Sequence, residues 1–190
     1  ASSSVRSDRP TLLHEGLDES ARAALLRAAN INPRTGLATD YLNHFNEAIM
    51  LLEMIPDMPE CADDFLEWHP LSYAEHFTAS NFKARDLAIS AYDTADPKIR
   101  TAFDNVTSAM TSILSAVSDA MRQAKQDKTR ATLAEQATGW VKPLVMQTAG
   151  IINGDREADV RANTILVNQV IAAQIRAHPE QWLWLHRRWR

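Results

Sequence analysis

Two carboxylates and an imidazole lie at helical spacing in one short segment of the chain. Asp40, His44 and Glu47 are separated by four and three residues, so a helix places all three side chains on one face. Because carboxylate oxygens and imidazole nitrogens bind divalent metals, these residues are the candidate metal ligands. The chain has no Glu-x-x-His sequence, which di-iron bundles use on facing helices. The competing interpretation is a surface cluster in which His44 pairs with its acidic neighbours.

His44 also suggests a second chemistry, phosphoryl transfer. The sequence of residues 43–47, Asn-His-Phe-Asn-Glu, is similar to the phosphoacceptor box of sensor kinases. No glycine-rich nucleotide-binding segment follows it, so this chemistry would be limited to a relay of phosphoryl groups.

The residue types that perform nucleophilic catalysis occur in unfavourable surroundings. Cys61 is the single cysteine and lies between Glu60 and Asp63, where negative charge raises a thiol pKa. One cysteine excludes an internal disulfide and a thiolate zinc site. The chain also lacks a Gly-x-Ser-x-Gly elbow and a phosphate-binding glycine loop. We therefore predict no catalytic residue and no cofactor.

Negative charge is concentrated in one part of the chain, although the net charge is only −4. No Lys or Arg occurs between Arg34 and Lys83. Nine acidic residues lie in that interval: Asp40, Glu47, Glu53, Asp57, Glu60, Asp63, Asp64, Glu67 and Glu75. This acidic segment, residues 35–82, would repel nucleic acid and predicts a basic protein partner, with self-association as the other form of partnership. Its candidate interaction residues are Asp57, Glu60, Asp63 and Asp64. The competing interpretation is a solvated face neutralised by the cations of residues 83–150.

The elements that must position these residues are expected to be helices. The 190 residues include only 5 Gly and 8 Pro, which disfavours turn-rich β folds, and the length suits one compact unit. We predict an all-α bundle of five or six helices followed by a Trp/Arg-rich tail. Its expected parts are a polar leader at 1–19, the bundle at 20–153, and a C-terminal helix with the tail at 154–190.

Apolar residues recur at steps of three and four, the spacing of one helix face. This pattern, with its capping and breaking residues, predicts helices over about 20–30, 40–55, 63–68, 72–92, 99–120, 129–151 and 157–177. Helix 99–120 has the longest stripe and is predicted to be central: Ile99, Phe103, Val106, Met110, Ile113, Val117 and Ala120. Pro143 is placed to kink the helix that contains it.

The C-terminal residues combine indole rings with guanidinium groups. Trp182, Trp184 and Trp189 are flanked by Arg187 and Arg188, and these five are candidate interaction residues. Indoles favour membrane interfaces and arginines attract anionic lipid, which predicts peripheral membrane contact. The competing interpretation is that the tryptophans pack onto the bundle. No apolar run is long enough for a membrane span and residues 1–10 lack a signal sequence, so we expect a cytoplasmic location with peripheral contact at the inner membrane.

The residues from Gly154 onward resemble the C-terminal end of bacterial lipid A acyltransferases of the lauroyl type. The terminal motif is matched by Pro179, Glu180, Gln181, Trp182, Trp184, His186, Arg188 and Trp189. The resemblance implies an α/β enzyme at the inner membrane that transfers an acyl chain from acyl carrier protein to a lipid A precursor. It also implies a catalytic His and acid in an H-x-x-x-x-D/E pattern, to which only His14 and Glu19 conform. Those two residues lack the surrounding family pattern, and no catalytic residue is assigned.

The first 150 residues resemble a different group of proteins. Residues 36–47 are similar to a stretch of helical proteins from α-proteobacteria to which no activity is attached. Two resemblances on one chain suggest a composite, with its junction at 151–155.

Overall fold

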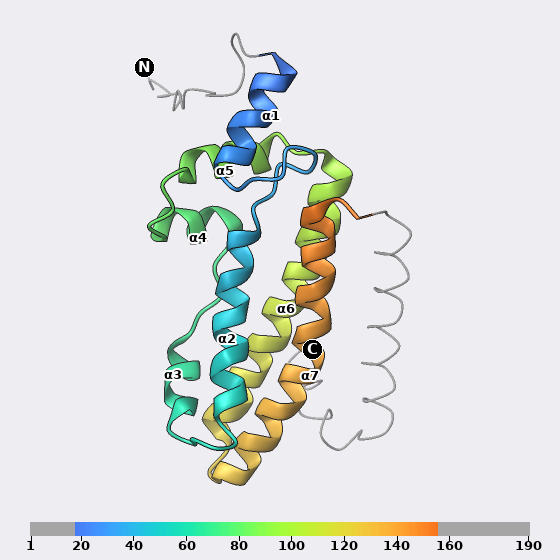
Figure 1. Ribbon diagram of the computed structural model, residues 1–190. Coiled ribbons are helices and arrows are strands. Elements are labelled where there is room, and N and C mark those ends of the chain that lie inside the picture. Colours follow the sequence, from blue (N-terminus) through green and yellow to red (C-terminus); the bar gives the residue numbers. More distant parts are fainter. Residues whose placement is uncertain (1–17, 156–190) are drawn as a thin grey trace, which may run out of the picture.

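The computed structural model describes residues 18–155 of the 190-residue chain, and these residues form an all-α fold (Figure 1). Seven α-helices and one short 3-10 helix are present in this range, with no strand. The helices are α1 (Glu19–Ala28), α2 (Leu42–Met54), α3 (Cys61–Glu67), α4 (Tyr73–Ala79), α5 (Arg85–Asp93), α6 (Pro97–Gln123) and α7 (Asp127–Asn153), and the 3-10 turn η1 (Thr39–Tyr41) precedes α2.

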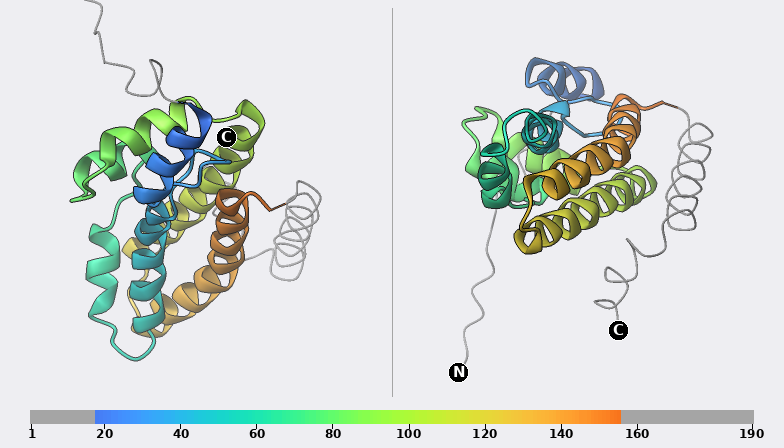
Figure 2. Two further views of the ribbon diagram at one scale, coloured as in Figure 1. Left: turned by 45° about the horizontal axis from the view of Figure 1, so that its top comes forward. Right: turned by 90° about the horizontal axis from the view of Figure 1, so that it is seen from below.

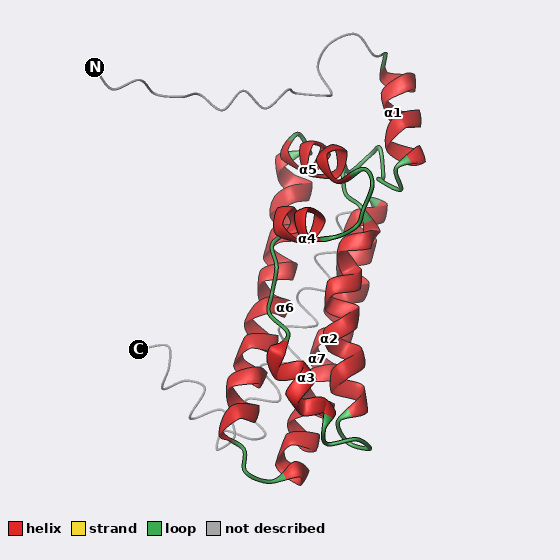
Figure 3. Cartoon of the chain, turned by 90° about the vertical axis from the view of Figure 1, so that its left-hand side faces the viewer, coloured by secondary structure: helices red, strands yellow, loops and turns green. Residues whose placement is uncertain are grey.

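Three long helices, α2, α6 and α7, run along the length of the molecule (Figure 1). Viewed from below, α7 lies between α2 and α6, and it packs against both (Figure 2). Helix α3 bridges α2 and α6 on one side. Helices α4 and α5 pack against each other near the end of the bundle where α1 lies (Figure 3).

The apolar stripes of the long helices form the core. The predicted stripe of α6 is confirmed, because Phe103, Val106, Met110, Val117 and Ala120 are buried and its other two members, Ile99 and Ile113, are half-buried. Its predicted central position is wrong, because α7 and not α6 lies between the other two long helices (Figure 2). On α2 the buried apolar residues are Leu42, Phe45, Ala48, Ile49 and Leu52. Helix α7 contributes Ala134, Ala137, Val141, Leu144, Ile151 and Ile152. Burial of these faces is the main stabilising term for helices of this kind.

The single helix predicted over 72–92 is wrong, because the chain breaks between α4 and α5. Ser80 is extended, and its hydroxyl donates to the Phe77 carbonyl and accepts from the Phe82 amide. Serine hydroxyls compete in this way with helical backbone bonds. The break brings the rings of Phe77 and Phe82 to 5.0 Å, so the lost turn of helix is replaced by aromatic packing.

Gly36 occupies a position in the loop between α1 and η1 where a side chain does not fit. Its φ is +71°, and a Cβ would lie 2.7 Å from the Ala91 carbonyl oxygen of α5. Only glycine satisfies both the left-handed backbone and this close approach.

The same loop holds the C-terminal end of α7. The buried Thr35 hydroxyl donates to the Ile152 carbonyl at 2.7 Å, and the Arg34 guanidinium donates to the Gly154 carbonyl at 3.0 Å. Directly after α7, Gly154 is left-handed, and the amides of Gly154 and Asp155 donate to the carbonyls of Ile151 and Gly150, respectively. These two bonds form a Schellman motif, which satisfies the last carbonyls and turns the chain away from the helix axis.

Helix α7 continues through Pro143, where a kink was predicted, from Asp127 to Asn153. Proline has no N–H, so the carbonyl of Gly139 has no partner four residues further along the helix. Both residues are exposed, which leaves this carbonyl to water.

None of the helices in residues 18–155 combines the length and apolarity needed to cross a bilayer. The predicted helix 157–177, the Trp/Arg tail and the leader up to residue 17 lie outside the described residues.

Candidate functional site

His44 is buried among aromatic rings, so its predicted place in a surface cluster is wrong. The side chain is only 6% exposed. Its ring stacks on the Trp68 indole at 4.7 Å between centroids and lies 5.6 Å from the ring of Phe45. In the sequence, Tyr41 and Phe45 lie close to His44 and favour a packed interior, but the stacking partner Trp68 is 24 residues away, so spacing alone does not identify it.

The polar atoms of His44 are engaged by backbone. Its Nε2 accepts a hydrogen bond from the Leu71 amide at 2.9 Å. Burial and, to a smaller extent, the neighbouring His76 lower the pKa of His44, a hydrogen bond to the His69 backbone opposes both effects, and the resulting pKa is about 4. The ring is therefore neutral near pH 7, with its proton on Nδ1 as the two hydrogen bonds require. In this arrangement it has no lone pair available for a metal ion or a phosphoryl group.

The other two predicted ligands do not converge on His44. The Asp40 carboxylate accepts a hydrogen bond from the Asn30 amide at 2.9 Å, and Glu47 is exposed on α2. Within residues 18–155 no group of three His, Cys, Asp or Glu side chains is arranged to hold a metal ion. The histidine and its neighbours instead fix the connection from α3 to α4.

Cys61 is buried at the start of α3. Burial raises its pKa, and the charges of Glu60 and Asp64 raise it further. This setting agrees with the prediction of a weakly nucleophilic thiol.

The acidic segment forms an exposed surface on α2, α3 and the turn between them. We define the acidic surface as the exposed residues Glu47, Glu53, Asp57, Glu60, Asp63, Asp64 and Glu67. The predicted neutralisation by later cations occurs at two points among the described residues, where Lys142 of α7 pairs with Glu53 and Arg130 lies 4.0 Å from Asp63. Asp63 remains 83% exposed, so its pair is weakly coupled.

Exposed methionines accompany these carboxylates. Met50 is 53% exposed and follows Glu47 by one helical turn, while Met58 is 39% exposed and lies between Asp57 and Glu60. Methionine side chains are flexible and polarisable, and they suit surfaces that bind apolar faces of varied shape. The surface thus combines negative charge with adaptable apolar area.

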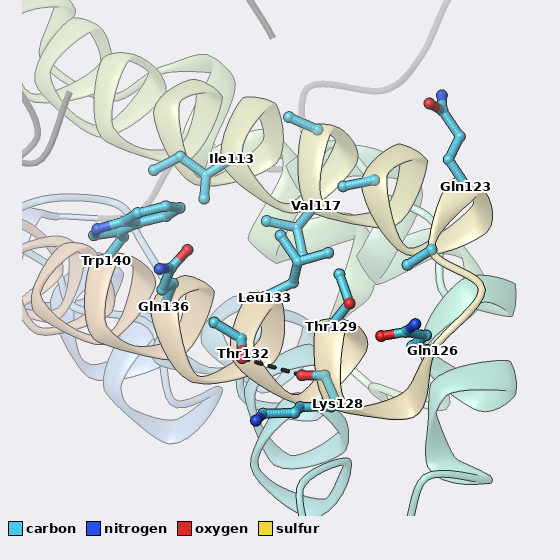
Figure 4. A pocket seen from close by; sticks show the side chains of 13 residues that line it. Ile113, Val117, Gln123, Gln126, Lys128, Thr129, Thr132, Leu133, Gln136 and Trp140 are labelled. Carbon is cyan, nitrogen blue, oxygen red and sulfur yellow. Dashed lines mark hydrogen bonds between the residues drawn. The ribbon is translucent and has the colours of Figure 1, made fainter. Parts of the chain in front are cut away.

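A groove of about 510 Å³ lies on a different face, between the C-terminal half of α6 and the N-terminal half of α7 (Figure 4). Its apolar walls are Ile113 and Val117 of α6 and Leu133 and Trp140 of α7 (Figure 4). Ile113, Leu133 and Trp140 are half-buried. Every residue that lines the groove comes from α6, α7 or the turn that joins them.

The groove opens away from α2 and α3. On α7, Trp140 lines the groove while Lys142 pairs with Glu53 of α2. Positions separated by two residues point about 200° apart around a helix, so Trp140 and Lys142 face nearly opposite sides of α7. On α6, Ala120 lines the groove while Arg122 donates to the Leu66 carbonyl of α3 at 2.7 Å. The acidic surface and the groove therefore lie on different sides of the bundle.

The candidate residues of the tail, Trp182, Trp184, Trp189, Arg187 and Arg188, lie outside the described residues, as does His14. The structure therefore places only the candidates in the bundle.

Comparison with known proteins gives one match. A family model described as bacterial lipid A biosynthesis acyltransferase matches residues 130–190, about a third of the chain. This match supports the resemblance of the C-terminal residues to that family, and it begins inside α7 rather than at Gly154. No curated protein and no solved structure matches the chain.

Proposed function

We propose that the chain is a non-enzymatic helical binding module that uses the acidic surface to bind a basic protein partner. The observation that supports this proposal is the exposure of all seven carboxylates of that surface, of which only Glu53 and Asp63 have an ion pair among the described residues. Uncompensated charge of one sign speeds and orients association with an oppositely charged partner.

The partner chemistry that fits is a basic amphipathic helix. Its apolar face would lie on Met50 and Met58, and its Lys or Arg residues would reach Glu47, Asp57 and Glu60. This mode of recognition, an amphipathic helix on an apolar surface rimmed by charge, recurs in proteins with methionine-rich binding faces.

A synthetic 18-residue Leu/Lys amphipathic peptide tests the proposal. We expect binding that weakens steeply with salt, because exposed charge pairs are screened within about 10 Å at 0.1 M ionic strength. The triple variant Asp57→Asn/Glu60→Gln/Asp64→Asn should bind about tenfold more weakly, a loss of about 1.4 kcal/mol.

The matched control removes the same number of charges elsewhere. Asp86→Asn/Asp93→Asn/Glu135→Gln changes three exposed carboxylates outside the acidic surface and should change the affinity less than twofold. Equal weakening by both triple variants would show that only net charge matters, and the proposed surface would be abandoned.

The family match supports a second candidate function. This second candidate is a component of the lipid A acylation machinery, or a fragment related to an acyltransferase, because residues 130–190 match that family. The described residues contain no parallel sheet of the kind that the α/β family implies. Transfer of an acyl group from acyl carrier protein to a lipid A precursor by the purified chain would favour this candidate over the binding module.

The proposed location is the cytoplasm, with peripheral contact at the inner membrane through the tail. The support for this location is the membrane association that the matched family implies, together with the indole and guanidinium groups of residues 182–190. Anionic vesicles test that contact, as described below.

A further inference from the structure

The α6–α7 groove is lined by apolar side chains, and the chain continues for 37 residues beyond the end of α7. We propose that residues 157–177 return along α7 as an amphipathic helix and fill this groove. The occupant is thus a segment of the same chain, and the inference is independent of the acidic surface.

The end of α7 directs the chain toward such a return. The Schellman motif at Gly154 turns the backbone out of the helix axis, and Thr35 and Arg34 hold that turn through the carbonyls of Ile152 and Gly154. Antiparallel helices are commonly joined by two to five residues, and residues 154–156 supply a connection of that length. A fourth long helix beside α7 would extend the existing arrangement of α2, α7 and α6.

The length of a helix over 157–177 matches the distance along α7 from its end to the groove. Trp140 lies about 20 Å and Leu133 about 30 Å before the end of α7 at 1.5 Å per residue. A helix over 157–177 is about 30 Å long, so an antiparallel return places Ile171 level with Gly139 and Ile175 level with Glu135. Val167, Ile171 and Ile175 then lie along the stretch of α7 that carries Trp140, Gln136 and Leu133 of the groove wall.

The chemistry of the two faces is complementary. The segment has its apolar residues on one stripe, Val160, Thr164, Val167, Ile171 and Ile175, at steps of three and four. The groove offers the half-buried side chains of Ile113, Leu133 and Trp140 as the partner surface. Burial of both faces removes apolar area from water, which is the driving force for helix packing in a bundle. The groove-forming half of α7 and the segment also fall within one continuous stretch of the family match.

Hydrogen exchange on the full-length chain at micromolar concentration tests the proposal. We expect slow exchange of the amides in 160–177 in the parent protein and at least a tenfold faster exchange there in Leu133→Glu, because a carboxylate in the groove wall opposes docking. The control Met146→Glu changes a large apolar residue that is 76% exposed and outside the groove, and should leave 160–177 protected. Protection of α2 and α6 in both variants reports that the bundle is folded.

Cross-linking supplies a second measurement in case Leu133→Glu destabilises the bundle. In a Cys61→Ala background, Gln136→Cys with Ile175→Cys should form a disulfide within one chain. Glu135→Cys with Ile175→Cys, at the same level but turned about 100° from the groove, should form it at least tenfold more slowly. Fast exchange of 160–177 in the parent would overturn the proposal. Protection or cross-linking that depends on protein concentration would assign the groove to a second copy instead and would also overturn it.

Discussion

The amide of Leu71 donates to Nε2 of His44 across 2.9 Å, while the hydroxyl of Tyr41 donates to the Leu71 carbonyl across 2.8 Å. The backbone N–H and C=O of Leu71 are thus both hydrogen-bonded, one by a side chain of α2 and the other by a side chain of η1. These two hydrogen bonds attach the connection between α3 and α4 to α2, and the first of them requires an unprotonated Nε2.

Acid should weaken the fold through His44. Because its pKa of about 4 lies below the ordinary value of 6.5, the unfolded chain binds the proton more tightly than the folded chain. The contribution of His44 to the free energy of unfolding should therefore be fully present above about pH 7, and about 3 kcal/mol of it should be lost as the pH decreases to about 4. Urea unfolding at several pH values measures this loss.

Two variants isolate the contribution of His44. His44→Gln keeps a hydrogen-bond acceptor and removes the titration, so its stability should depend less on pH than that of the parent. Burial also lowers the pKa of His76, while the Asp40 backbone and the carboxylates of Asp40 and Glu47 oppose the shift, so some dependence should remain. The exposed His69 serves as the control, and an effect of His69→Gln equal to that of His44→Gln would contradict the assignment.

Thr35 should contribute to stability through its hydroxyl rather than its shape. Thr35→Val preserves the volume but leaves the Ile152 carbonyl without its buried donor, which should cost about 1–3 kcal/mol. Chemical unfolding measures the loss. Thr101→Val makes the same change at an exposed position of α6 and should cost less than about 0.5 kcal/mol. If the two variants are equally stable, the Thr35 bond is unimportant.

Two glycine-to-alanine changes should have opposite signs. Gly36→Ala introduces a Cβ 2.7 Å from the Ala91 oxygen at a positive φ and should destabilise the fold by about 2 kcal/mol or more. Gly139→Ala meets nothing within 4 Å on an exposed helical position and should stabilise it by about 0.5–1 kcal/mol. Thermal unfolding compares them, and a neutral Gly36→Ala would refute the close approach of this loop to α5.

The tail tryptophans should report whether they meet a bilayer. Replacing Trp68 and Trp140 by Phe leaves fluorescence from Trp182, Trp184 and Trp189 alone. If the tail binds the membrane, as proposed for its location, anionic vesicles should shift their emission to the blue, and Arg187→Gln/Arg188→Gln should reduce the shift at least severalfold. An emission that is already blue-shifted and unchanged by vesicles would instead indicate packing on the bundle.

Periodicity was sufficient to predict the long helices. The stripes that begin at Leu42 and Ile99 place their apolar residues on one face, and the structure buries or half-buries all of them. Such patterns can be recognised within a short stretch of sequence, because residues at helical spacing lie on one face and that face is buried.

Two of the failures have different physical causes, one local and one between distant segments. The break at Ser80 is stabilised by the packing of Phe82 on Phe77, which no local helix propensity records. His44 is polar by type, yet Trp68 and Leu71, which are 24 and 27 residues away, supply its stacking partner and its hydrogen-bond donor. Residue type and spacing alone therefore indicated an exposed ligand where the fold has a structural histidine.

The position of α7 also constrains how this sequence can change. The acyltransferase-like stretch begins at Arg130, yet its first 24 residues include a wall of the core that packs against α2 and α6. Exchanging that stretch as a block would replace buried residues such as Val141 and Leu144 together with the tail, and mismatched partners on α2 would open the bundle. An exchanged stretch is therefore compatible with this fold only if its α7 still completes the core.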